Sequence, residues 1–210
     1  MITKQDYWDM RAQTYDQIMK TTFRGIHRDT VDHISRYLKS TDRVLDFACG
    51  TGLISTDISP RVASVQAIDL SPEMIVRAKA NVQEYGVQNV QVSLMDLFDP
   101  ALEPGSFDVV IAGNVLCYVD NWEQVMQRIQ QLLPPDGVFL SATDCLGQES
   151  SRVGAKKFYQ RCIGQMPYVK FFRQTGLEKK IRGSGFHLLE TAVLGRHPTN
   201  VFVAARKEIG

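Results

Sequence analysis

The feature that most constrains this chain is a turn of small residues between an apolar strand and a helix. The expected strand covers residues 43–47, Asp46 lies near its end, and the turn 48–52 (ACGTG) follows at once. A second apolar run ends at Asp69. A backbone bare of side chains lets a ligand approach the carboxyl end of a strand, and a carboxylate on the next strand can accept hydrogen bonds from ribose hydroxyls. The pattern predicts an α/β fold that binds a nucleoside.

A dinucleotide fold is the first alternative, since its fingerprint also places glycines after a strand. That fingerprint requires Gly-x-Gly-x-x-Gly or Ala, and its third position, aligned on Gly50 and Gly52, is Ser55 here. A carboxylate at Asp46 would also lie beside the diphosphate, so that like charges meet in a partly dry loop. The same carboxylate favours a cationic ligand. The sequence therefore predicts a nucleoside that carries positive charge and no diphosphate.

The run from Asp46 to Gly52 resembles motif I of the class I S-adenosylmethionine-dependent methyltransferases, whose cofactor carries an ammonium and a sulfonium and no phosphate. Further matches follow in the family's order within residues 40–142. Asp69, in the match to motif II, would bind both ribose hydroxyls, because a carboxylate accepts from two donors at once. Asp96 would meet the adenine edge, and Asn114 would face the methionine end of the cofactor.

The resemblance also implies apolar and aromatic contacts to the cofactor. Leu70, Met74 and Leu97 would enclose the adenine, although such residues are also ordinary core. Tyr7 and Tyr15 of an N-terminal helix would cover the sulfonium, since a cation over an aromatic face gains about 0.5–2 kcal/mol; packing of this face on the core is the alternative. The full set that the resemblance implies is Tyr7, Tyr15, Asp46, Ala48, Gly50, Gly52, Asp69, Leu70, Met74, Asp96, Leu97 and Asn114.

Strand and helix signals alternate along the chain and predict a doubly wound, mainly parallel, seven-stranded Rossmann-like sheet with an antiparallel C-terminal strand. Strands are expected at residues 43–47, 65–69, 90–94, 107–112, 138–142, 186–194 and 200–206. We expect a single domain, 1–210, with lid helices at 1–40, a cofactor-binding core at 41–142, a helical insertion on the acceptor side at 143–185 and closing strands at 186–210.

Composition limits the partners. The chain has 210 residues and a formal net charge of +1, so no overall field recruits nucleic acid. The four cysteines form no Cys-x-x-Cys pair and no metal-type spacing, so we expect free thiols, no metal site and a cytoplasmic protein. No run approaches the ~18 apolar residues of a membrane span. Both a monomer and a homodimer remain open.

Catalysis of methyl transfer is mainly a matter of orientation, which can supply roughly 7–11 kcal/mol. A base is needed only if the acceptor must lose a proton. Many relatives that methylate quinones and small metabolites have a His after the Leu of motif IV, whereas Cys117 and Tyr118 follow Leu116 here. His187, His197 and Tyr118 are the candidate bases. The sequence assigns none of them as catalytic.

The acceptor is expected to be a small molecule. Segment 144–185 is basic and aromatic and predicts a pocket for an aromatic or anionic compound; in the alternative, its aromatic residues pack inward and its cations face water. Methylation of a macromolecule is disfavoured, because residues 113–116 (GNVL) lack the Asn-Pro-Pro-Tyr-type motif for amide nitrogens. A cofactor-binding protein that is inactive, or that catalyses another reaction, is the third hypothesis.

Overall fold

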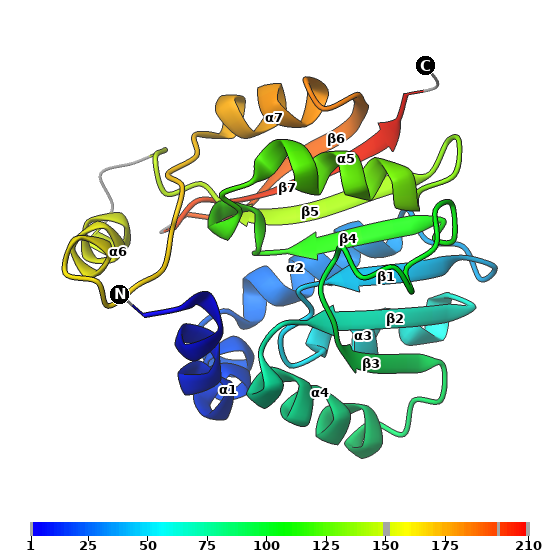
Figure 1. The fold of residues 1–210 in the computed structure, drawn as a ribbon, viewed down its shortest axis with the longest axis horizontal. Helices are drawn as coiled ribbons and strands as arrows, with labels where there is room; N and C mark the ends of the chain where they lie inside the picture. The colour runs from blue at the N-terminus through cyan, green and yellow to red at the C-terminus, as the bar shows by residue number, and fades with distance from the viewer. Residues whose placement is uncertain (1, 149–151, 197, 209–210) are drawn as a thin grey trace.

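The computed structural model describes residues 2–148, 152–196 and 198–208 (Figure 1). In these residues a seven-stranded sheet has the order β3-β2-β1-β4-β5-β7-β6. Strand β7 is antiparallel to both of its neighbours, and the other pairs are parallel. This confirms the predicted sheet. The strands are β1 (Arg43–Phe47), β2 (Ser64–Asp69), β3 (Val90–Leu94), β4 (Val109–Gly113), β5 (Val138–Asp144), β6 (Phe186–Gly195) and β7 (Asn200–Lys207).

Helices cover both faces of the sheet (Figure 1). None in the described ranges combines the length and the apolar character needed to cross a membrane. The helices are α1 (Lys4–Thr21), α2 (Arg24–Ser35), α3 (Leu53–Ile58), α4 (Pro72–Glu84), α5 (Trp122–Leu132), α6 (Arg152–Cys162) and α7 (Gln174–Arg182), with short 3-10 turns η1 (Ser59–Arg61) and η2 (Leu116–Tyr118).

The central strands are apolar on both faces because each face carries a core. Val44 of β1 and Val109 of β4 pack in the core that holds Ile34 of α2 and Ile58 of α3. Their successors along the chain, such as Leu45, pack in the core beneath α5 and α7. This alternation is the period of two that a strand imposes, and it explains the nearly continuous apolar runs in the sequence.

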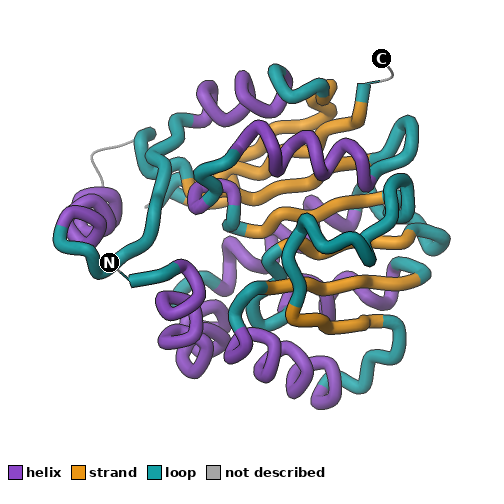
Figure 2. Tube along the Cα trace, in the orientation of Figure 1, coloured by secondary structure: helices purple, strands orange, loops and turns teal. Residues whose placement is uncertain are grey.

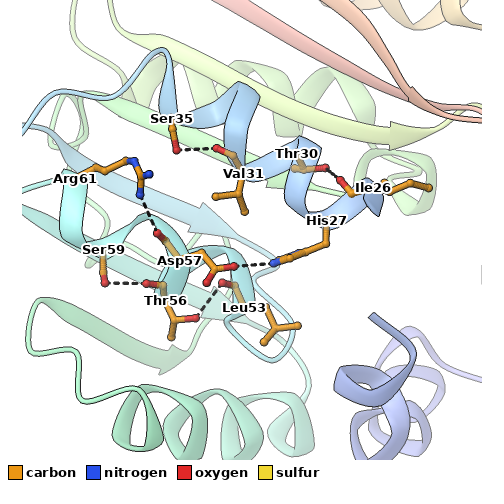
Figure 3. A network of polar contacts seen from close by, with 10 residues as sticks. All are labelled: Ile26, His27, Thr30, Val31, Ser35, Leu53, Thr56, Asp57, Ser59 and Arg61. Atoms are coloured by element: carbon orange, nitrogen blue, oxygen red, sulfur yellow. Dashed lines mark hydrogen bonds and ion pairs between the residues drawn. The ribbon is translucent and has the colours of Figure 1, made fainter. Parts of the chain in front are cut away.

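Helices α2 and α3 are joined by a polar contact as well as by the core (Figure 3). His27 Nε2 lies 2.7 Å from Asp57 Oδ2. The hydroxyl of Thr30 donates to the carbonyl of Ile26 at 2.8 Å, one turn back in α2. Helix α3 follows the turn 48–52 directly, so this pairing fixes the helix that the turn begins.

Helix α1 lies beyond the carboxyl ends of the strands and is tied to α4 (Figures 1 and 2). Asp16 Oδ2 accepts from Asn81 Nδ2 at 2.9 Å, and that amide also donates to the Thr51 carbonyl at 2.9 Å. Near the start of α1, Asp9 accepts a hydrogen bond from the hydroxyl of Ser71, the N-cap of α4. Helix α1 is therefore docked both on α4 and on the turn.

The two helices in segment 144–185 belong to different layers of the fold. Its described part holds α6 and α7, separated by an extended stretch that contains Pro167. Leu177 and Ile181 of α7 are fully buried in the core under the sheet, so α7 is a covering helix of the sheet and not part of an acceptor pocket. Only α6 lies at the carboxyl ends of the strands (Figure 1).

Candidate cofactor site

A cavity of about 300 Å³ opens between α1 and the carboxyl ends of β1, β2 and β4. The volume is within the range of small-molecule sites. In open α/β sheets ligands bind where the strand order reverses, which here is between β1 and β4. The lining includes these residues from the sequence-predicted set: Tyr15, Ala48, Gly50, Asp69, Leu70, Met74, Asp96, Leu97 and Asn114.

The backbone is contorted where it lines the cavity. Ala48 and Asn114 have φ of 56° and 54°, a left-handed conformation that costs non-glycine residues about 1–3 kcal/mol and often marks a functional site. Gly50 has φ of 56°, and a Cβ there would stand 4.0 Å from both Met74 Sδ and Tyr15 Cε1. A side chain at Gly50 would therefore occupy space beside the cavity.

Asp69 is held in place by the backbone. Its Oδ2 accepts from the Gly50 N–H at 2.9 Å, and its Oδ1 accepts from the Ser71 N–H at 2.9 Å. Burial raises the pKa of Asp69, while these backbone hydrogen bonds oppose the rise. Each oxygen keeps a further lone pair, so the carboxylate can still accept from two ligand hydroxyls.

Two of the other predicted residues, Asp46 and Gly52, lie outside this cavity. The Asp46 side chain is 1% exposed and accepts a hydrogen bond from Ser55 Oγ at 2.5 Å. It borders a smaller cavity of about 40 Å³, which adjoins the first at Ala48 and Asn114. Gly52, with φ of 74°, would place a Cβ 3.3 Å from Ala78 Cβ. Gly52 therefore allows the turn and the close packing of α4. Asp46 is buried, and its side chain borders the smaller cavity.

The third, Tyr7, also lies outside the lining. Tyr7 is 4% exposed, packs in the core and carries the Arg11 guanidinium 3.5 Å from its ring centroid. The neighbouring Trp8 lines the cavity together with Tyr15, and the two ring centroids are 6.4 Å apart. Trp8 and Tyr15 are two helical turns apart and share a face, whereas Tyr7 does not. The spacing of seven residues placed Trp8 on the same face as Tyr15, but only the docking of α1 shows that this face borders the cavity.

The candidate bases differ in their position relative to the cavity. Tyr118 lines the cavity. His187 pairs across β6 and β7 with Arg206, which also pairs with Val138 at the start of β5. His187 is therefore at the amino-terminal edge of the sheet, opposite the cavity, and it cannot act there as a base. His197 lies outside the described residues.

Comparison with known proteins identifies the family. The methyltransferase domain family matches residues 45–141. The chain is 41% identical over 152 residues to the ubiquinone biosynthesis O-methyltransferase of Xanthomonas euvesicatoria, a match that covers 70% of this chain and 63% of that protein. It is 30% identical over 174 residues to the enzyme of the same name from Xylella fastidiosa, covering 80% and 70%. The chain belongs to the class I S-adenosylmethionine-dependent methyltransferases.

The fold comparison agrees with this. A chain from the complex between the Haloferax volcanii Trm112 methyltransferase activator and a methyltransferase superposes with a TM-score of 0.79. The two are 17% identical, and the match covers 99% of this methyltransferase and 100% of that chain. At this identity the likeness concerns the fold, and it extends over the N-terminal helices and over β6 and β7 as well as the central strands.

The methyl donor of this methyltransferase family, S-adenosylmethionine, fits the chemistry of the cavity. Asp69 and Asp96 offer carboxylates to a polar, cationic nucleoside, and Trp8 and Tyr15 offer aromatic faces. Among the described lining residues the only formal cation is Lys4, whose Nζ lies 2.9 Å from the carboxylate of Asp120. A diphosphate would meet acids here without an unpaired cation to balance it.

Proposed function

We propose that this methyltransferase transfers the methyl group of S-adenosylmethionine to a hydroxyl oxygen of a small aromatic or anionic acceptor, as a single domain. The observation that carries the proposal is the cavity at the strand ends, acidic where the nucleoside would bind and aromatic at Trp8, Tyr15 and Tyr118. The oxygen nucleophile is supported by the relatives, whose names describe them as O-methyltransferases. The chain spans 63% and 70% of their lengths, so their acceptors are not carried over.

The cofactor would be held by residues of the turn and the strand ends. Bound there, it supplies an electrophilic methyl group on a sulfonium. Asp69 would accept from the ribose hydroxyls and Asp96 from the adenine amine, while Trp8 and Tyr15 cover the cationic end. The remaining contacts in the proposal are Ala48, Gly50 and Asn114 along the backbone, and Leu70, Met74 and Leu97 around the adenine.

Helix α1 would contribute by excluding water and by limiting the poses of the acceptor. Its Trp8 ring stands edge-on to Tyr118 with 5.2 Å between centroids, so one aromatic wall is shared between the lid and the loop after β4. Such a wall can hold a planar acceptor with its oxygen aimed along the carbon–sulfur axis, the alignment that an in-line displacement requires.

Two measurements test the function. Calorimetry should detect micromolar binding of S-adenosylmethionine and S-adenosylhomocysteine, lost in Asp69→Ala and kept in Asp32→Ala, an exposed acid of α2. Radiolabelled S-adenosylmethionine, incubated with the protein and a panel of phenols and hydroxy acids, should then label an organic product. If neither nucleoside binds, the cofactor proposal fails. If both bind and no acceptor is labelled, the proposed reaction fails.

A further inference from the structure

A polar cluster lies behind the part of the cavity wall that Tyr118 forms. Lys157 Nζ of α6 lies 3.2 Å from Asp144 Oδ2 and 3.5 Å from Tyr118 Oη. The Asn200 amide donates to Asp144 Oδ1 at 3.0 Å and to Asn114 Oδ1 at 2.7 Å. The cluster thus joins α6, the end of β5, the start of β7 and the loop after β4. The cofactor contacts proposed above use none of it except Asn114.

This cluster is not an ordinary surface ion pair. The side chains of Lys157 and Asp144 are 19% and 22% exposed, and Tyr118 is 8% exposed. Ion pairs at the surface contribute little because water screens them, whereas a pair shielded in this way keeps a strong local field. The neighbouring Lys156, in contrast, is exposed. Lys157 is therefore the lysine of α6 whose charge reaches the cavity wall.

The hydrogen-bonding state of Tyr118 follows from its partners. An ammonium can only donate, so Lys157 donates to the phenol oxygen. No residue in the described part of the chain accepts the phenol's own proton in turn. Burial raises the pKa of Tyr118 well above its usual value, and the negative forms of Cys117, Tyr7, Asp144 and Tyr15 raise it further. The phenol stays protonated at neutral pH, so it is a donor and not the base considered from the sequence.

We propose that Tyr118 is a catalytic hydrogen-bond donor to the acceptor oxygen and that Lys157 is a positioning residue that acts through Tyr118. The inference rests on the proposed O-methylation. A cation behind a phenol polarises its O–H bond and strengthens the hydrogen bond that it donates. The acceptor oxygen is then stabilised as an anion, in a protein that lacks the histidine found after Leu116 in many relatives. Asp144 holds Lys157 in place, and Asn200 in turn holds Asp144.

The reaction balances with the groups named. The acceptor hydroxyl releases its proton to bulk water as the acceptor enters the cavity, before α1 excludes water, and its oxygen then takes the hydrogen bond from Tyr118. The oxygen anion then forms a bond to the methyl carbon as the carbon–sulfur bond breaks, and the electron pair of that bond returns to sulfur. The products are the methyl ether and neutral S-adenosylhomocysteine. Tyr118 keeps its proton throughout.

The experiment measures the ionisation of a bound phenol by its colour. 4-Nitrophenol is titrated by absorbance in the presence of the protein and saturating S-adenosylhomocysteine. The pKa of the bound probe should fall by about one unit relative to the free probe in the unaltered protein, and this shift should vanish in Tyr118→Phe. Lys157→Met should lose most of the shift, Lys157→Arg should keep it, and Lys156→Met should match the unaltered protein.

The kinetic counterpart uses a phenol that the protein methylates. Tyr118→Phe and Lys157→Met should lower kcat/KM by about 10- to 100-fold near neutral pH. The rising limb of the pH profile should move to higher pH, because the acceptor must ionise without the hydrogen bond from Tyr118. The affinity for S-adenosylhomocysteine should stay within about threefold, which also reports correct folding. The other groups that face Tyr118, namely Cys117, Tyr7, Asp144 and Tyr15, are present in every variant.

The outcomes are distinguishable. A bound probe whose pKa is the same with and without the Tyr118 hydroxyl overturns the inference, as does a probe that fails to bind the unaltered protein. Methylation of phenols with pH profiles unaffected by Tyr118→Phe overturns the inference and leaves the proposed function intact. Absence of any methyl transfer from S-adenosylmethionine overturns the proposed function itself.

Discussion

Asp46 is a residue whose burial opposes folding near neutral pH. Removal from water raises its pKa to about 7, and the hydrogen bond from Ser55 offsets only part of this rise. The unfolded chain, with an ordinary aspartate pKa, releases the proton above about pH 4. The stability that the bound proton provides is therefore complete below that pH and is lost as the pH rises through about 7. A nearby cationic ligand would favour the ionised form.

The substitution Asp46→Asn should consequently separate stability from ligand binding. We expect the gain in free energy of unfolding of the ligand-free variant to be about 2–3 kcal/mol larger near pH 8 than near pH 5, because at pH 5 Asp46 is still neutral in the folded chain and is ionised only in the unfolded chain. Its affinity for S-adenosylmethionine near pH 8 should fall about tenfold. Denaturant melts and calorimetry at the two pH values check this, with Asp32→Asn as the exposed control. An equal gain at both pH values would contradict the argument from charge.

Trp8 leads to a second prediction for a single residue. A ring face attracts the sulfonium of S-adenosylmethionine, while the neutral thioether of S-adenosylhomocysteine gains little from it. Trp8→Leu should therefore weaken binding of S-adenosylmethionine by about 2- to 30-fold more than that of S-adenosylhomocysteine, and Trp8→Phe should restore most of the difference. Calorimetric Kd values for the two ligands give the ratio. A ratio that is unchanged in Trp8→Leu would show that the ring only fills space.

The residues around the cavity show how much of the site can be predicted from the sequence. Asp69 and Gly50 could be placed because the order of strand, turn and second strand puts them at one edge of the sheet. The position of Asp46 was predictable, but its orientation beneath the turn depends on the register of β1, which pairs Asp46 with Ala67 and Ile111. Choosing between Tyr7 and Trp8 required the docking direction of α1, which local spacing alone does not contain.

Helix α1 is the element that closes the cavity, and its docking depends strongly on one amide. Asn81 is 1% exposed and bonds both Asp16 on α1 and the Thr51 carbonyl in the turn. Without it, the Thr51 carbonyl loses this donor, and Asp16 Oδ2 keeps the longer hydrogen bond from Arg77 at 3.3 Å. A buried group that is left unsatisfied costs about 1–3 kcal/mol. Because α1 and the turn share this amide, the lid and the cofactor loop should loosen together.

The matching prediction concerns Asn81→Ala. Amide hydrogen exchange should accelerate about tenfold or more in α1 and in residues 48–52, while β4 and β5 keep their protection. Binding of S-adenosylhomocysteine should weaken in parallel, since the ligand must then order the lid. Lys79→Ala, an exposed change on the same helix, is the control. Uniform acceleration across the sheet would mean global destabilisation and would refute a local role.

Elements differed in how well the sequence predicted them. Strands β1, β2 and β4 followed from apolar runs that only a sheet covered on both faces explains. The helices of segment 144–185 were expected from the sequence, but their places in the fold were not, because they belong to different layers and composition carries no information about layers. Gly164, with φ of 72°, and Pro167 mark the break between α6 and α7. These breakers were visible in the sequence, but the burial of α7 depends on β6 and β7, which come later in the chain.

At the scale of the whole molecule, ligand binding and stability are linked. The cavity is built from α1, from three strands and from the loop after β4, so a ligand that occupies it contacts elements far apart in the sequence. Unfolding destroys all of these contacts together. A ligand that binds only the folded state therefore stabilises the whole chain by mass action, whatever the local stability of the lid.

S-adenosylhomocysteine at about 100 times its Kd should raise the free energy of unfolding by about 2.7 kcal/mol, which for a chain of this size corresponds to a Tm increase of roughly 5–11 °C. Adenosine should give a smaller rise, because it fills only the part of the cavity near Asp69 and Asp96. NAD should give none, since its diphosphate would lie against acidic groups beside the turn. Thermal melts with the three compounds at equal concentration make the comparison. A rise with NAD that equals or exceeds the rise with S-adenosylhomocysteine would contradict the electrostatic assignment of this cavity, because the same carboxylates cannot favour both ligands.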